Sequence, residues 1–197
     1  SHVTLSSPWD ITYSDGVLYL AMAGIHQIWD LDLTNMQALP FAGSGTEGII
    51  DGTYRDAQLA QPSGIVAQGG KIFFADSETS SIRFIDLHLA ERVETIIGKG
   101  LFDFGDVDGK SSEVKLQHPL ALSIQNEYLY ITDTYNNKIK RISIDTGETK
   151  TIAGSGQSGF KNGTWNTSSF YEPGGIEIHK NKIYVADTNN SKIRKIE

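Results

Sequence analysis

The stretch from Pro173 to Ile196, PGGIEIHKNKIYVADTNNSKIRKI, contains the pattern that decides the fold. It opens on a proline and carries a short apolar run, a polar turn and a second apolar run, Ile183–Ala186, that ends at Asp187. After another polar turn, apolar and cationic residues alternate from Ile193. Short runs rich in isoleucine, valine and tyrosine between polar turns are typical of β-strands, and the alternation indicates a strand with one buried face. The stretch therefore predicts three consecutive antiparallel strands.

This pattern occurs four times in the chain. Each copy opens at a proline, and the four prolines are almost evenly spaced: Pro8, Pro62, Pro119 and Pro173. An aspartate stands fourteen residues after the last three prolines, at Asp76, Asp133 and Asp187, and Met22 takes that position in the first copy. An isoleucine follows six residues later in every copy. Four copies in register identify an internal repeat of about 55 residues.

A fourth short run, which ends in glycine, completes the repeat, as in Thr95–Gly98 and Thr151–Gly154. Four short antiparallel strands at this period describe one blade of a β-propeller, so the expected fold class is all-β. At this period the 197 residues hold about 3.6 blades. The last repeat stops after its third strand, and Val3-Thr4-Leu5 fits an outer strand, either of a preceding blade or of the last one in a small closed ring. We expect the chain to be part of a longer propeller.

The composition excludes several kinds of function. No cysteine is present, so disulfides, thiolate metal sites and cysteine nucleophiles are excluded. The 17 basic and 24 acidic residues give a formal net charge of −7, which makes nucleic-acid binding an unfavoured interpretation. The sequence shows neither a hydrophobic leader nor an apolar span long enough to cross a bilayer. We therefore expect a cytoplasmic protein without membrane contact.

The repeat resembles that of NHL-repeat β-propellers. The resemblance rests on Pro-x-Gly-Ile, then Tyr-Val-Ala-Asp-Thr-x-Asn, then Ile-Arg or Ile-Lys, seen best in Pro173–Ile196 and Pro119–Ile142. Three further stretches, Ala21–Trp29, Phe104–Gly109 and Leu116–Leu120, are similar to the propeller of thioredoxin-like, NHL-repeat-containing proteins. The match concerns the propeller alone, since the chain has no Cys-x-x-Cys.

The resemblance implies a six-bladed propeller, of which residues 1–197 are one segment. It also implies a non-catalytic scaffold that binds a protein partner within a larger protein. Open blade edges are then expected to be covered by missing blades or by self-association. Two alternatives remain: a metal-dependent six-bladed lyase or lactonase-like enzyme, for which the first strands offer mainly Asp10 and Glu177, and an RNA-binding NHL module. We expect no cofactor, no metal and no catalytic residue.

The repeated aspartates Asp76, Asp133 and Asp187 are predicted to be structural turn residues. An aspartate carboxylate can accept hydrogen bonds from the backbone N–H groups of its own turn, and asparagines such as Asn137 tolerate the left-handed backbone of a reversal. A ligand-binding role for these aspartates is the alternative interpretation.

Three long connections, residues 43–61, 98–118 and 154–172, join one repeat to the next. In an antiparallel four-stranded blade these connections emerge on the same face as the aspartate turns, and long loops of this kind are usually functional. We therefore take this loop-bearing face as the predicted binding surface. Its candidate residues are Phe102, Phe104, Asp106, Asp108, Tyr135 and Trp165. The aromatic side chains could equally fold back onto the propeller, and the acidic cluster does not fit a calcium-binding EF-hand loop.

Overall fold

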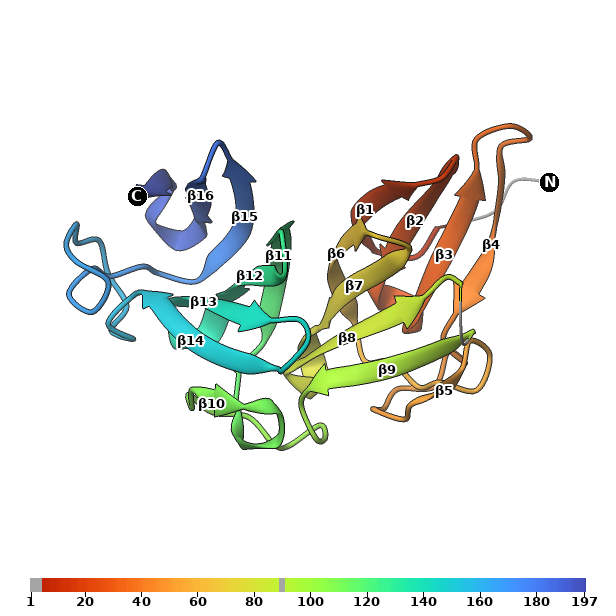
Figure 1. The fold of residues 1–197 in the computed structure, drawn as a ribbon, viewed down its shortest axis with the longest axis horizontal. Helices are drawn as coiled ribbons and strands as arrows, with labels where there is room; N and C mark the ends of the chain where they lie inside the picture. The colour runs from red at the N-terminus through yellow and green to blue at the C-terminus, as the bar shows by residue number, and fades with distance from the viewer. Residues whose placement is uncertain (1–4, 89–90) are drawn as a thin grey trace.

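The computed structural model describes residues 5–88 and 91–197 and shows an all-β protein (Figure 1). Its described residues form four antiparallel sheets arranged as successive blades of a partial β-propeller. This confirms the predicted fold class. Val3 and Thr4, which the sequence analysis assigned to an outer strand, lie outside the described residues.

The first three blades each contain four consecutive antiparallel strands. The strands of the first blade are β1 (Pro8–Ser14), β2 (Val17–Met22), β3 (Gln27–Asp32) and β4 (Gln37–Ala42). Those of the second are β6 (Pro62–Gln68), β7 (Lys71–Asp76), β8 (Ser81–Asp86) and β9 (Arg92–Ile97). Those of the third are β11 (Pro119–Gln125), β12 (Tyr128–Asp133), β13 (Lys138–Ser143) and β14 (Glu148–Ala153). The fourth sheet has three strands, β15 (Pro173–His179), β16 (Lys182–Asp187) and β17 (Lys192–Ile196).

The innermost strands β1, β6, β11 and β15 lie side by side around a common centre (Figure 1). In each blade the opening proline pairs with the residue fourteen positions later, for example Pro119 with Asp133. The second and third strands are joined by a single 3₁₀ turn that ends in a left-handed residue: His26, Ser80, Asn137 and Ser191. These turns and the connections between blades therefore emerge on one face, as predicted.

The connections between blades are ordered by the blade that follows them. Short strands β5 (Gly52–Thr53) and β10 (Gly109–Lys110) within these connections pair with β9 and β14, the outermost strands of the next blades. Each of these two connections therefore runs from the fourth strand of one blade to the outer edge of the next, and then returns to its first strand. The length of the connection is used to cover a blade edge that would otherwise be open.

Within residues 5–88 and 91–197, the hydrophobic core consists of three clusters, one at each junction between neighbouring blades. Residues of the connections take part: Leu59 lies in the cluster between the first two blades, and Leu116 in the next. Both leucines are fully buried. The connections are thus part of the core and not simple surface loops.

Leu116→Ala should lower the free energy of unfolding by about 3 kcal/mol, because truncating a fully buried leucine removes apolar contacts and leaves a cavity. The measurement is urea denaturation. Leu33→Ala, at a leucine that is 43% exposed, is the matched control and should change the value by less than about 0.5 kcal/mol. Equal losses in the two variants would show that the connection does not contribute to the core.

Candidate binding face and the buried cations beneath it

A buried cation joins each of the last three blades to the connection that precedes it. In the second blade, Arg83 on β8 is fully buried. Its Nη1 lies 3.0 Å from Asp76 Oδ2, and its Nη2 donates to Asp51 Oδ1 over 3.0 Å. The same guanidinium donates to two main-chain carbonyls of the connection, those of Gln58 and Ile50. Arg83 thus fastens the aspartate of the turn to the connection.

The third blade has lysine in place of arginine. Lys140 on β13 is fully buried, and its Nζ lies 3.4 Å from Asp133 Oδ2. It also donates to Asp106 Oδ1 over 2.9 Å and to Asp108 Oδ1 over 3.0 Å. Lysine cannot present the planar fork of arginine, so two carboxylates of the connection converge on a single ammonium group.

The fourth blade returns to arginine. Arg194 on β17 donates to Asp187 Oδ2 over 2.7 Å and to Asn162 Oδ1 over 2.8 Å. It also donates to the carbonyls of Ser169 and Lys161, at 3.0 Å each, and lies over the rings of Phe160 and Phe170. This arrangement repeats that of Arg83, with an amide where the second blade has a carboxylate.

We call each buried cation, together with the turn aspartate and the side chain of the connection that it contacts, a clamp. The three clamps share one spacing along the chain. The cation stands seven residues after the aspartate of the turn, as Arg83 follows Asp76. The side chain contributed by the connection also precedes the cation by a constant number of residues. The separation is the same from Asp51 to Arg83 and in the corresponding pairs of the other two blades. The alternation of apolar and cationic residues does not identify the cations as partners of the aspartates, because charged side chains at alternating positions of a strand usually face solvent. The fixed offset of seven residues was the signal that could have revealed them.

The aspartates make different contacts from those predicted. Within the described residues, each carboxylate accepts the backbone N–H two residues before the opening proline instead of the N–H groups of its own turn. In the second blade, Ala60 N lies 2.7 Å from Asp76 Oδ1. The first blade explains why: it forms the same turn with Met22 in place of aspartate. The turn does not need the carboxylate, and the connection does.

A second repeated contact joins neighbouring blades. In each of the first three turns, the left-handed residue accepts the N–H of the residue before the next opening proline. Asn137 Oδ1, for example, accepts from Glu172 N over 2.9 Å. Glu172 itself has a positive φ of 47°. Successive turns of the loop-bearing face are therefore tied to the blades that follow them.

Burial shapes the electrostatics of the clamps. The loss of hydration raises the pKa of Asp76 and of Asp133 to about 6, although the neighbouring Arg83 and Lys140 oppose the shift. Burial also acts to raise the pKa of Asp106 and Asp108, but hydrogen bonds and the charge of Lys140 outweigh it and lower both. Among the carboxylates around Lys140, those of the connection, Asp106 and Asp108, therefore ionise more readily than Asp133 of the turn.

Asp106 and Asp108, predicted as binding residues, are engaged within the chain. Asp106 pairs with Lys138 and Lys140. Asp108 accepts from Lys140 and, over 2.7 Å, from the backbone N–H of Thr151 on β14. Asp51 makes the corresponding contact with Thr95 on β9. These acids link the connection both to the cation and to the outermost strand.

Three of the predicted aromatic residues meet around one hollow of about 270 Å³ on the loop-bearing face. Phe102 and Phe104 come from the connection between the second and third blades, and Tyr135 comes from the turn of the third. Phe102 is 90% exposed, and the other two are about half exposed. His118 completes the group: its ring stacks on that of Tyr135 with centroids 4.5 Å apart. Burial lowers the pKa of His118, so its imidazole is predominantly neutral at pH 7.

Trp165 lies apart from this group. It lines a different hollow, of about 470 Å³, together with Phe170 and Arg194 of the fourth blade. The structure therefore divides the predicted binding residues into an aromatic cluster (Phe102, Phe104 and Tyr135), two acids that pair with Lys140, and one separate tryptophan.

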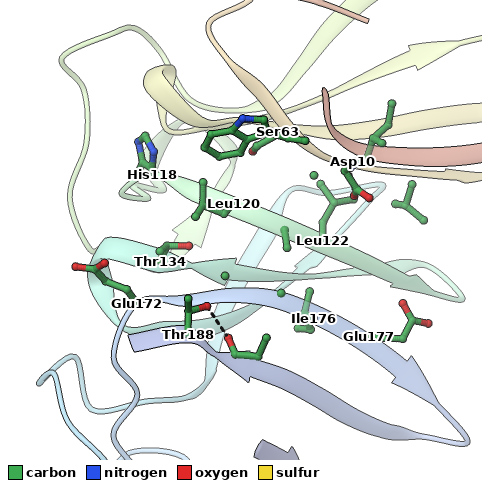
Figure 2. Close-up of a pocket in the computed structure, with 18 of the residues that line it drawn as sticks. Asp10, Ser63, His118, Leu120, Leu122, Thr134, Glu172, Ile176, Glu177 and Thr188 are labelled. Atoms are coloured by element: carbon green, nitrogen blue, oxygen red, sulfur yellow. Dashed lines mark hydrogen bonds between the residues drawn. The ribbon is translucent and has the colours of Figure 1, made fainter. Parts of the chain in front are cut away.

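A cleft of about 850 Å³ lies between the innermost strands (Figure 2). Asp10 and Glu177, the polar candidates for an enzyme, line it from the first and fourth blades. Asp10 Oδ2 already accepts the backbone N–H of Ile65 over 2.9 Å. In the described ranges, no group of three or more His, Cys, Asp or Glu side chains is placed to hold a metal ion. No helix in the same ranges is long and apolar enough to cross a membrane.

Arg83→Met should lower the free energy of unfolding by about 3 to 5 kcal/mol, because it leaves Asp76 buried without its cation. Chemical denaturation measures this loss. Arg92→Met, at an exposed arginine of β9, is the matched control and should lose less than about 0.5 kcal/mol. A small loss in both variants would contradict the clamp.

The pKa of Asp133 predicts a specific pH dependence. Folding raises the pKa of Asp133 from 3.8 to about 6, so the folded state binds the proton more tightly than the unfolded state does. The contribution of Asp133 to stability therefore falls as the pH rises between these two values. Asp133→Asn cannot titrate. The wild-type chain should therefore lose up to about 3 kcal/mol relative to this variant between pH 4 and pH 6.5, measured by urea denaturation at each pH. A gain over this range would show that the pKa is lowered instead.

The comparisons with known proteins agree with the repeat. No protein-family model matches the chain. Over 205 residues it is 41% identical to Protein SUPPRESSOR OF QUENCHING 1, chloroplastic, of Arabidopsis thaliana, an alignment that covers 98% of this chain and 19% of that protein. Over 226 residues it is 38% identical to NHL repeat-containing protein 2 of Gallus gallus, with 98% of this chain and 31% of that protein covered. The chain thus spans less than a third of either relative.

Among solved structures, an auxiliary nutrient binding protein from Bacteroides ovatus superimposes with a TM-score of 0.77 at 17% sequence identity, covering 95% of this chain and 47% of that one. At this identity the likeness concerns the fold alone. The repeat in register, the blades it forms and the two relatives together lead to one conclusion: the chain belongs to the NHL-repeat β-propellers.

Proposed function

We propose that this propeller segment is a non-catalytic scaffold that binds a protein partner through its loop-bearing face. The observation that carries the proposal is the aromatic cluster of Phe102, Phe104 and Tyr135 around one hollow. Aromatic side chains are enriched in the cores of protein interfaces, whereas a monomer rarely leaves several of them together in water. A partner that buries Phe102 would remove most of its side chain from water.

The segment that carries Phe102 and Phe104 is fastened to the rest of the chain, which favours a binding role for these exposed side chains. Asp103, next to Phe102, forms an ion pair with Lys115. On the other side, Asn136 of the turn donates to the carbonyl of Gly105 over 2.6 Å. The segment is therefore fastened between the two phenylalanines, at Asp103, and directly after Phe104, at Gly105. A rigid aromatic anchor loses little conformational entropy on binding, which favours affinity.

The partner is expected to offer an apolar side chain to the hollow and a hydrogen-bond donor or cation at its rim. Glu78 lines the hollow from the turn of the second blade. Its carboxylate, 39% exposed, lies 3.9 Å from His118 Nδ1. Burial lowers the pKa of His118, which disfavours the charged imidazole as a permanent ion-pair partner of Glu78.

A photo-crosslinking amino acid placed at position 102 of the full-length protein should capture a defined partner in cells. The same amino acid at Met36, which is exposed on the opposite face, is the control and should not capture it. Phe104→Ala and Tyr135→Ala should each weaken binding of the captured partner at least tenfold, as expected for residues at an interface hot spot. Equal capture at both positions, or unchanged affinity in both variants, would overturn the proposal.

A further inference from the structure

The Asn162-Gly163 pair stands out among the clamp residues contributed by the connections. The corresponding residues of the second and third blades are aspartates, Asp51 and Asp108, and glycine follows in all three cases. All three precede their cation by the same number of positions. Asn162-Gly163 is also the one Asn-Gly dipeptide in the sequence. The repeat therefore places an amide where its other copies place a carboxylate.

The contact of Asn162 with its cation matches that of Asp51 with Arg83. Arg194 Nη2 donates to Asn162 Oδ1 over 2.8 Å, and Arg83 Nη2 donates to Asp51 Oδ1 over 3.0 Å. Arg194 is held in place by Asp187 and by two carbonyl groups. Its guanidinium is therefore fixed against the oxygen of the Asn162 side chain, while Asn162 itself is exposed to solvent.

We propose that Asn162 is a site of spontaneous deamidation promoted by Arg194. The backbone nitrogen of Gly163 attacks Cγ of Asn162, and negative charge develops on Oδ1 in the tetrahedral intermediate. Arg194 Nη2 already donates to that oxygen, so it stabilises the charge as an oxyanion-hole donor does. Glycine at position 163 has no side chain to hinder the attack.

The remaining steps balance with water as the second reactant. The Gly163 nitrogen loses its proton, the Cγ–Nδ2 bond breaks, and ammonia leaves into solvent, which gives a cyclic succinimide. Water then adds to one of the two ring carbonyls, and the bond from that carbon to the Gly163 nitrogen breaks while the nitrogen takes up a proton. Addition at Cγ gives aspartate, and addition at the main-chain carbonyl gives isoaspartate. No oxidation or reduction takes place.

The aspartate product completes an ion pair for which the second blade already shows the geometry. Aspartate at position 162 would meet Arg194 as Asp51 meets Arg83. Hydrogen bonds between two charged groups are about twice as strong as neutral ones, so the connection would be fastened more tightly to the fourth blade. The isoaspartate product adds a methylene to the main chain and should loosen the same contact.

The test follows deamidation of the purified chain at mildly alkaline pH by peptide mapping, with the aspartate and isoaspartate products separated. Asn166, which is also exposed but is followed by threonine, is the internal reference. Asn162 should convert faster than Asn166. Arg194→Met should slow Asn162 at least about tenfold, a smaller effect than the hundredfold or more that an enzyme loses with one oxyanion donor. Arg92→Met, at the exposed arginine of β9 that takes no part in a clamp, should leave the Asn162 rate unchanged.

An equal or faster rate at Asn162 in Arg194→Met would overturn the proposal. A second measurement does not depend on the folding of that variant: unfolding the wild-type chain in urea separates Arg194 from Asn162 and should slow the reaction. A rate that stays the same or rises in urea would also overturn it. Asn162→Asp, the stable equivalent of the product, should raise the midpoint of thermal unfolding, and a lower midpoint would refute the tightening of the clamp.

Discussion

The structure depends on a cation buried at the third strand of a blade. Arg83, Lys140 and Arg194 each carry a positive charge into a position that is closed to solvent or nearly so. Such a charge is costly to bury unless it is paired and hydrogen-bonded, and only the aspartate of the turn and the preceding connection together can satisfy it. The blade therefore requires its connection, which in turn covers the outermost strand and contributes leucines to the core. Strand, turn and connection form one unit.

This constraint also supports the proposed binding surface. The connections would be mobile if they were attached only at their ends, but the clamps fix them against their blades. Phe102 and Phe104 belong to the connection whose acids hold Lys140. An aromatic side chain on such a support is presented to solvent in a defined position. Asp106 and Asp108, predicted as binding residues, fasten this connection to Lys140.

The copies of the repeat differ where the clamp differs. Of the acids in the connections, two pair with Lys140 and one with Arg83, whereas Arg194 faces the amide of Asn162. The first blade has Met22 and Trp29 at the positions of the aspartate and the cation, and Trp29 donates to Gln27 instead. The turn keeps its shape in all four blades. Backbone geometry is therefore set by the strands, and the clamp is an additional device that each copy can modify.

The sequence by itself determined the strands, the repeat of about 55 residues and the face on which the connections emerge, because these follow from local alternation and from the direction of an antiparallel chain. It also pointed to Phe102, Phe104 and Tyr135 as candidates. Only the tertiary structure decided that these three share a hollow, that Trp165 does not, and that Asp106 and Asp108 face inward to Lys140. The reason is physical. Asp108 and Lys140 lie far apart along the chain, so the residues around Asp108 give no local signal that Lys140 is its partner. Whether such a charge meets solvent or a buried cation depends on how the connection folds back over the blade.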